Sequence, residues 1–187
     1  ISGNNLLVAL VLTMVSSLVL GMGLPTAAAY ILVATLTAPA LVSMGVDLMA
    51  AHMFVFYSAM LSSITPPVAL AAFAAAAISR DPPMRVSMVA VKYGFVAFLL
   101  PYFFVIEPRL LGEGSLLEIA GIFVTSVIGI LVLACVIQGQ FINRIPLAIR
   151  GLLGVAAIAI LMPDTTFKIT GAAIVVAVLI AKKLAKT

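Results

Sequence analysis

The chain has 187 residues, of which 65% are hydrophobic and 9% charged, and its formal net charge is +4. With a mean hydropathy of +1.35, this composition excludes a soluble globular domain and predicts an all-α, polytopic membrane protein. The basic runs are no longer than Lys182-Lys183, which argues against nucleic-acid binding. A single cysteine, Cys135, excludes an intrachain disulfide.

The chain begins at Ile1 rather than at methionine, and an apolar segment follows at once. This segment lacks the basic region and the small-residue cleavage site of a signal peptide. We therefore expect the chain to be the C-terminal portion of a larger protein.

The first predicted element is a helical hairpin over residues 6–41. Its apolar arms, Leu6 to Leu20 and Ala27 to Leu41, are joined by the turn Gly21 to Thr26, which contains two glycines and a proline. Each arm would be about 22 Å long, shorter than a hydrocarbon core of about 30 Å. The uncharged turn favours a re-entrant hairpin whose tip lies inside the bilayer. Two short tilted spans joined by a surface turn are the alternative.

A broken helix is predicted over residues 48–79. Its arms, Leu48 to Leu61 and Val68 to Ile78, are separated by the sequence Ser62-Ser63-Ile64-Thr65-Pro66-Pro67. Neither arm is long enough to cross a membrane alone, but together they cross it if the break lies near the membrane centre.

The break at 62–67 is the predicted binding centre of a transporter. Pro66 and Pro67 lack backbone N–H groups, so carbonyls before them lose their helical partners. Irregular backbone at membrane depth is tolerated where it is buried in protein or lines a polar cavity, and transporters hold ions and substrates at such breaks. A proline kink whose hydroxyls bond back to carbonyls is the alternative.

Three polar residues near the broken helix have structural interpretations. Asp47 precedes the helix and is predicted to be its N-cap. His52 is either hydrogen-bonded within the bundle, or a proton-sensitive or partner-contacting group. Lys92 lies close enough to the end of the next span to reach the membrane surface.

Further spans are expected beyond the surface loop at residues 80–85. They are Val86 to Ile106, Leu116 to Ile137, Leu147 to Met162 and Ile169 to Ala181. We therefore divide the chain into a transport-core half-repeat (1–79), a connecting region (80–115) and C-terminal transmembrane helices (116–187).

Basic residues in the loops predict the orientation of the chain. Alternate loops place most of them on one side: Arg80, Arg85, Arg144, Arg150, Lys182, Lys183 and Lys186. The other side has only Arg109 and Lys168. By the positive-inside rule the first side, and with it the C-terminus, is cytoplasmic.

Several ordered motifs resemble a known family. They are Gly21 to Tyr30 (GMGLPTAAAY), Ala38 to Leu41 (APAL), Ala51 to Tyr57 (AHMFVFY), and Ser62 to Phe73 (SSITPPVALAAF). This series resembles the large, M-type membrane subunit of TRAP transporters, and most of all the fused permeases of TAXI-type systems. Only the second half of that family's inverted repeat is covered.

The resemblance implies sodium-coupled uptake of a small organic acid by an elevator-type movement in a bacterial inner membrane. Its implied partners are a periplasmic substrate-binding protein, the remaining permease half or small membrane subunit, and the lipid bilayer. No cofactor is implied besides sodium as coupling ion, and no enzymatic activity. The resemblance also implies a dicarboxylate or similar acid as the substrate.

Neutral oxygens in the two breaks are compatible with that mechanism, since sodium is a hard ion that needs no carboxylate. The expected sodium ligands are hydroxyls or carbonyls at Gly21, Gly23, Ser62, Ser63 and Thr65. An anionic substrate would be held by half-helix N-termini and nearby groups. The expected substrate-binding residues are Pro25, Thr26, Ser62, Thr65 and Pro66. Which break holds the ion and which the substrate stays open.

An ion- or solute-conducting channel is the alternative function, because channels also use broken helices and polar groups at depth. An intramembrane enzyme is disfavoured, since His52 has no evident acidic or cysteine partner within the membrane.

Overall fold

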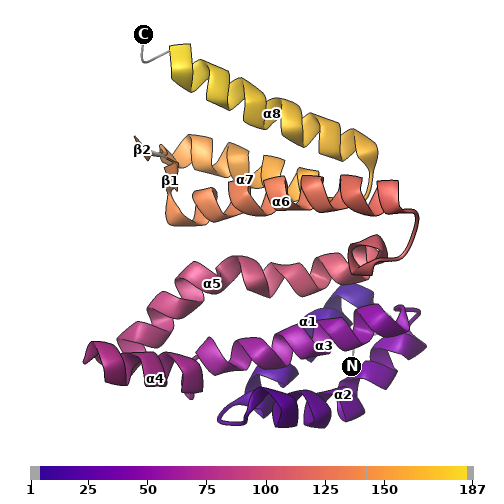
Figure 1. The fold of residues 1–187 in the computed structure, drawn as a ribbon, viewed down its shortest axis with the longest axis vertical. Coiled ribbons are helices and arrows are strands. Elements are labelled where there is room, and N and C mark those ends of the chain that lie inside the picture. The colour runs from indigo at the N-terminus through magenta and orange to yellow at the C-terminus, as the bar shows by residue number, and fades with distance from the viewer. Residues whose placement is uncertain (1–4, 142, 185–187) are drawn as a thin grey trace. The chain divides into compact units, whose positions relative to one another are not determined.

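The computed structural model describes residues 5–141 and 143–184 (Figure 1). The chain divides into two compact units, Ile1–Leu111 and Gly112–Thr187. Nearly all of the regular structure is helical, which confirms the predicted all-α class. The exception among the described residues is a two-residue strand pair, β1 (Gln140–Phe141) with β2 (Asn143–Arg144), that the sequence did not predict.

Unit 1 contains the predicted hairpin, the predicted broken helix and one long span. Its elements are α1 (Leu6–Gly21), α2 (Thr26–Ser43), α3 (Leu48–Leu61), η1 (Ser62–Ile64), α4 (Leu70–Ser79), α5 (Pro83–Ile106) and η2 (Pro108–Leu111). The last of these, η2, is a 3₁₀ turn that the sequence did not predict. Helix α5 begins three residues earlier than expected because Pro83 suits the first helical position, where no N–H is needed.

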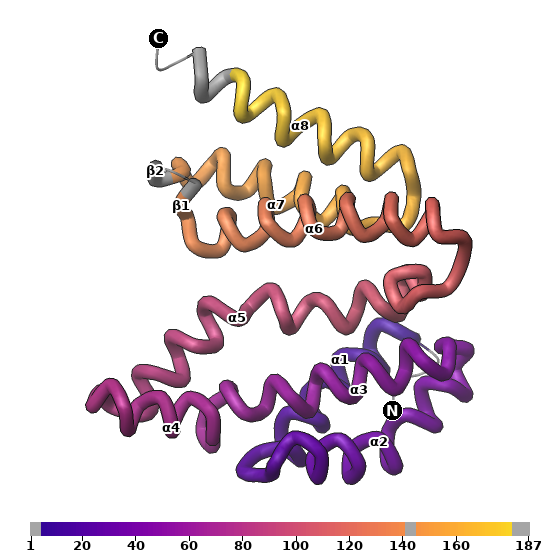
Figure 2. Tube along the Cα trace, viewed as in Figure 1, coloured from indigo at the N-terminus to yellow at the C-terminus, as the bar shows by residue number. Residues whose placement is uncertain are grey.

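The path of unit 1 reverses direction three times (Figure 2). The chain runs one way along α1, back along α2, forward again through α3 and α4, and back along α5. Helix α3 packs against α1, α2 and α5, so it is the central helix of the unit. Helix α4 continues beyond the break and packs on α5.

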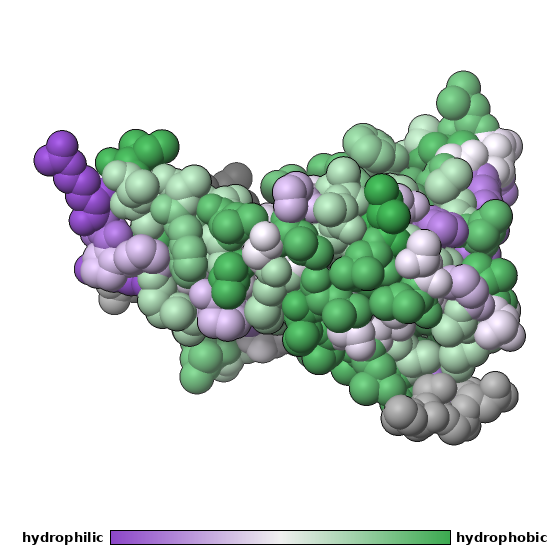
Figure 3. All heavy atoms as spheres, turned by 90° about the horizontal axis from the view of Figure 1, so that it is seen from below, coloured by the Kyte–Doolittle hydropathy of each residue, from purple (hydrophilic) through white to green (hydrophobic). Residues whose placement is uncertain are grey.

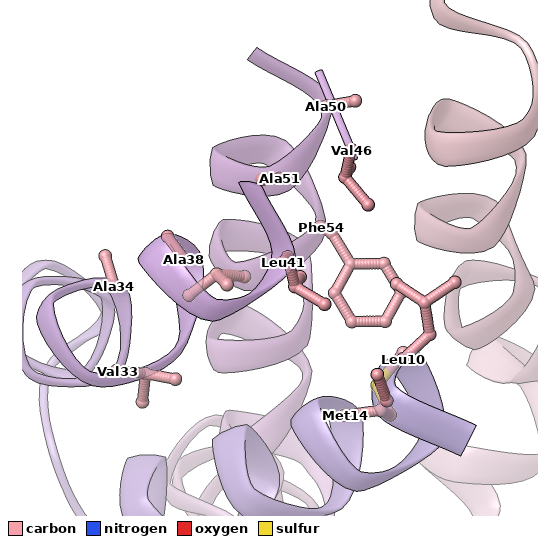
Figure 4. Packing of buried hydrophobic residues seen from close by; sticks show 12 residues of the cluster. Leu10, Met14, Val33, Ala34, Ala38, Leu41, Val46, Ala50, Ala51 and Phe54 are labelled. Carbon is pink, nitrogen blue, oxygen red and sulfur yellow. The ribbon is translucent and has the colours of Figure 1, made fainter. Parts of the chain in front are cut away.

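The core of unit 1 forms where α1, α2 and α3 meet (Figure 4). Phe54 of α3 is fully buried, and its ring lies beside Leu10 of α1 and Leu41 of α2. Tyr102 of α5 makes an edge contact with the Phe54 ring at a centroid distance of 5.2 Å. Because alanines such as Ala51 occupy the helix contacts, the backbones approach closely.

The N-terminus of α3 has the predicted cap. The Asp47 carboxylate accepts a hydrogen bond from the N–H of Ala50 at 3.0 Å, which confirms Asp47 as the N-cap.

Unit 2 consists of α6 (Leu116–Gln138), α7 (Leu147–Leu161) and α8 (Thr165–Leu184), with α7 packed on both neighbours. Gly129 and Gly171 permit this packing. A methyl group at Gly129 would lie 2.8 Å from Leu161 Cγ, and one at Gly171 would lie 2.6 Å from the Ala156 carbonyl oxygen.

An arginine of α7 hydrogen-bonds to the C-terminal end of α6 in unit 2. The Arg150 guanidinium donates to the carbonyls of Val136 (2.9 Å) and Ile137 (3.2 Å), which lie at the end of α6. Both carbonyls lie in the last turn of α6, and the Val136 carbonyl also accepts from the Gly139 N–H at 3.2 Å. Arg150 therefore helps to cap the C-terminal end of α6.

Three described helices, α2, α5 and α6, are long and apolar enough to cross a membrane. Helix α2, expected to be a hairpin arm too short to cross, is thus longer than predicted. Helices α1, α3, α4 and α7 are shorter, as predicted for α1 and for the two arms of the broken helix. The long apolar helices agree with a polytopic membrane protein, with short helices arranged around the break.

Candidate ion and substrate site at two helix breaks

The two breaks predicted from the sequence lie in direct contact. Gly21 is the last residue of α1, and a methyl group there would lie 2.6 Å from Ser62 Oγ and 3.0 Å from Ser62 Cβ. Such distances are too short for any side chain, so only glycine allows the end of α1 to meet the start of the break.

A second contact joins the hairpin tip to the far side of the break. Gly23 has φ +75°, a left-handed conformation that glycine adopts without strain. A methyl group there would lie 3.4 Å from Val68 Cγ1. The tip between α1 and α2 therefore contacts both ends of the interruption, Ser62 before the prolines and Val68 after them.

These contacts place the hairpin tip partway along the broken helix. Helix α3 has 14 residues and α4 has 10, so they rise about 21 Å and 15 Å on either side of the break. The tip therefore stops well short of the far end of α4. Since α2 is also long enough to cross a membrane, the re-entrant hairpin and the pair of spans both stay predictions.

Each hydroxyl in the break donates to a carbonyl of α3. Ser62 Oγ donates to the Ala59 carbonyl (2.6 Å), Ser63 Oγ to that of Met60 (2.7 Å), and Thr65 Oγ1 to that of Leu61 (2.7 Å). This is the pattern expected of a capped proline kink. It also leaves lone pairs on all three hydroxyl oxygens, since a hydroxyl is both donor and acceptor.

The backbone of the break has a short 3₁₀ turn. The Thr65 N–H donates to the Ser62 carbonyl at 3.2 Å. Pro66 and Pro67, joined by a cis peptide bond, carry no N–H with which to reach back to α3 or η1. The Ser63 carbonyl would accept from the N–H of residue 67 in a continuous α-helix, but Pro67 has no N–H to donate.

Burial separates the predicted ligands into two groups. Ser62 is 1% exposed because it faces Gly21, while Ser63, Thr65 and Pro66 are half-buried. The tip is more accessible: Gly23 and Pro25 are exposed and Thr26 is half-buried. Ser62 is therefore the most enclosed of the predicted ligands, and Gly23 and Pro25 are the most accessible.

Helices α2 and α4 both start at this site without a side-chain cap. Their N-cap residues, Pro25 and Ala69, make no side-chain hydrogen bond within the described part of unit 1. Helices α1 and α3 are instead capped by Asn5 and Asp47. The first-turn N–H groups of α2 and α4 can therefore bind an anion, and their helix dipoles favour it.

The sequence did not identify two neighbours of this site, Val68 and Gly94. Gly94 lies in the middle of α5, and a methyl group there would lie 3.0 Å from Ile64 Cδ1. Helix α5 therefore passes close to the break. Gly94 could have been noticed in the sequence, because a glycine within a long apolar helix commonly marks close packing against a neighbouring helix.

His52 lies in α3, upstream of the break. Its Nδ1 shares a hydrogen bond with the Tyr30 hydroxyl of α2 at 3.0 Å. The Tyr30 ring also makes an edge contact with Phe56, at a centroid distance of 5.5 Å. These contacts confirm that the histidine is hydrogen-bonded within the bundle.

The described part of the chain contains no cluster of metal-binding side chains. Among the described residues no group of three His, Cys, Asp or Glu side chains could hold a metal ion.

Residues 1–119 match the family model described as "Tripartite ATP-independent periplasmic transporter, DctM component". The chain belongs to this family. The match covers more than half of the 187 residues, including both breaks and all of α5. No curated protein and no solved structure matches the chain. The DctM assignment makes the chain a membrane component of a TRAP-type secondary transporter, which agrees with the expectation of a non-enzymatic protein.

Proposed function

We propose that this DctM chain couples sodium binding to the uptake of a small organic acid at the two joined breaks. The contact between Gly21 and Ser62 carries the proposal, because it brings both sets of predicted ligands into one place. In this proposal the chain is the second half of a TAXI-type permease, and it works with the other half and a periplasmic substrate-binding protein.

Sodium is bound by neutral oxygens in this scheme. The hydroxyl oxygens of Ser62, Ser63 and Thr65 keep lone pairs while their protons point at α3 carbonyls. The carbonyls of Gly21, which accepts from the Leu24 N–H at 3.2 Å, and of Gly23 are the proposed ligands from the hairpin tip. A site of this kind suits a hard cation and needs no proton to leave before the ion binds.

The organic acid is bound by the starts of α2 and α4. Both helices begin at the breaks without a side-chain cap, so their N–H groups are available to a carboxylate. The Thr26 and Thr65 hydroxyls and the ring edges of Pro25 and Pro66 are the other proposed contacts of the acid. Because ion and substrate share Ser62 and Thr65, binding of one orders the ligands of the other.

Orientation follows from the loop charges. The hairpin over residues 6–41 opens from the periplasmic side, the C-terminus lies in the cytoplasm, and the complete protein resides in the bacterial inner membrane. Unit 1 carries the moving site, and an elevator-type displacement of this unit would expose it to either side.

The test is sodium-dependent uptake by the complete transporter in proteoliposomes. Ser63→Ala and Thr65→Val should each raise the sodium concentration for half-maximal uptake, while expression stays near normal. Losing one hydroxyl bond in a membrane bundle costs only about 0.6 kcal/mol of stability.

Thr37→Val is the matched control, because the Thr37 hydroxyl also donates to a carbonyl one turn back, that of Val33 at 2.9 Å, but within α2. Its sodium dependence should equal that of the wild type. If Ser63→Ala, Thr65→Val and Thr37→Val all behave alike, the break is a structural kink and the ion binds elsewhere.

A further inference from the structure

A cavity of about 400 Å³ lies where α4 and α5 meet, away from the two breaks. Six residues line it: Ala75, Ser79, Asp81, Arg85, Val86 and Val89. Ala75 and Ser79 come from the last turns of α4, and the others from the α4–α5 connection and the start of α5. No step of the proposed transport uses this cavity.

The cavity crosses the expected boundary between water and lipid. Helix α5 is a candidate membrane span that begins at Pro83, so Arg85 lies in its first turn. Val89 lies four residues beyond Arg85, roughly 6 Å further along the helix axis at 1.5 Å per residue. The charged end of the cavity is therefore at the level of lipid headgroups, and its valine wall is at the level of acyl chains.

The space-filling view agrees with this division. Hydrophilic atoms gather at the end of unit 1 where α4 meets α5, and apolar surface extends from there along the helices (Figure 3). An occupant of the cavity must therefore be amphipathic, with a polar group at the connection and an apolar part beside α5.

Two opposite charges line the cavity without pairing. Among the described residues, neither the Asp81 carboxylate nor the Arg85 guanidinium makes a hydrogen bond or ion pair. The hydrogen bonds in the α4–α5 connection are made by backbone and hydroxyl groups instead. For example, the Asp81 N–H donates to Ser79 Oγ at 3.4 Å. A single cavity thus offers one cationic and one anionic group to an occupant.

We propose that this cavity binds an aminophospholipid, phosphatidylethanolamine. The Arg85 guanidinium pairs with the phosphate through two parallel N–H donors, and the Asp81 carboxylate accepts from the ammonium group. One acyl chain lies along Val86 and Val89. A lipid with a purely anionic headgroup fits less well, because it offers Asp81 no cation.

The experiment uses the complete transporter in phosphatidylcholine vesicles that contain a trace of photoreactive lipid. The lipid is phosphatidylethanolamine in one set and phosphatidylglycerol in the other. After illumination, mass spectrometry measures the labelling of residues 75–89. The wild type should be labelled several-fold more by phosphatidylethanolamine.

Two variants assign the headgroup contacts. Arg85→Gln should reduce labelling by phosphatidylethanolamine about tenfold, as expected for the loss of a charge-assisted pair. Asp81→Asn should bring the two lipids to equal labelling, because it removes the partner of the ammonium group. Arg80→Gln is the matched control, because Arg80 is a charged residue of the same connection that does not line the cavity. This variant should change the labelling by neither lipid.

Three results would overturn the proposal. Equal labelling of the wild type by both lipids excludes the aminophospholipid whatever the variants do. If Asp81→Asn is still labelled more by phosphatidylethanolamine than by phosphatidylglycerol, Asp81 does not bind the ammonium group. Equal losses in Arg80→Gln and Arg85→Gln show a diffuse charge attraction in place of a site.

Discussion

Replacing Gly21 by alanine tests whether the contact between the two breaks forms the ion site. The new methyl group would lie 2.6 Å from Ser62 Oγ and 3.4 Å from the Ala59 carbonyl oxygen. Ser62 is 1% exposed and already bonded to Ala59, so its side chain has no free space to move into. The end of α1 must therefore move away from the break.

The cost of such overpacking is about 1–3 kcal/mol. If the two breaks supply ligands to one sodium ion, their separation weakens binding by that amount. The half-saturating sodium concentration for uptake should then rise roughly 5- to 150-fold. Uptake by the complete transporter is measured against sodium concentration in proteoliposomes, and thermal unfolding of the purified protein is followed in parallel.

Gly121→Ala is the matched control, because Gly121 lies within α6 and a methyl group there meets no atom within 4 Å. It should leave both sodium dependence and thermal stability unchanged.

A double variant separates steric from ligand effects. Gly21→Ala with Ser62→Gly removes both clashing atoms of Ser62, so thermal stability should recover most of its loss. Sodium affinity should stay low, because the Ser62 hydroxyl is gone. Normal sodium dependence in Gly21→Ala, or full recovery of it in the double variant, would refute a site that includes Ser62.

Further predictions concern the prolines, the orientation and the cap. Pro66→Ala restores an N–H and lets the helix continue, so it should raise the half-saturating sodium concentration at least as much as any single hydroxyl variant. In a background without native cysteine, cysteines at Ser79 and Gly139 should react with an impermeant reagent from the cytoplasmic side, and one at Gly112 from the periplasmic side; reaction of Gly112 and Gly139 from the same side would contradict α6 as a span. Asp47→Ala should lower stability in thermal unfolding by about 1 kcal/mol without changing sodium dependence.

Local chemistry explains why so much of unit 1 was predictable. Two successive prolines, Pro66 and Pro67, remove two adjacent N–H donors and interrupt the helix, and the Asp47 side chain caps the helix that follows it directly. The long apolar runs predict α5 and α6 in the same way, since only a helix satisfies its backbone within a single segment. The positions of the breaks follow from the amino-acid sequence itself.

Contacts between distant residues were beyond such reasoning. Nothing in the residues around Gly21 indicates that Ser62 lies against it, or that Gly94 faces Ile64. The bonds from Arg150 to the end of α6 were likewise unpredicted, because an arginine in the first turn of a span also suits the membrane surface. The sequence by itself determined where the helices break and which polar atoms the breaks contain. Only the tertiary structure decided that the two breaks meet, because helix packing depends on the close fit of whole faces and not on any one residue.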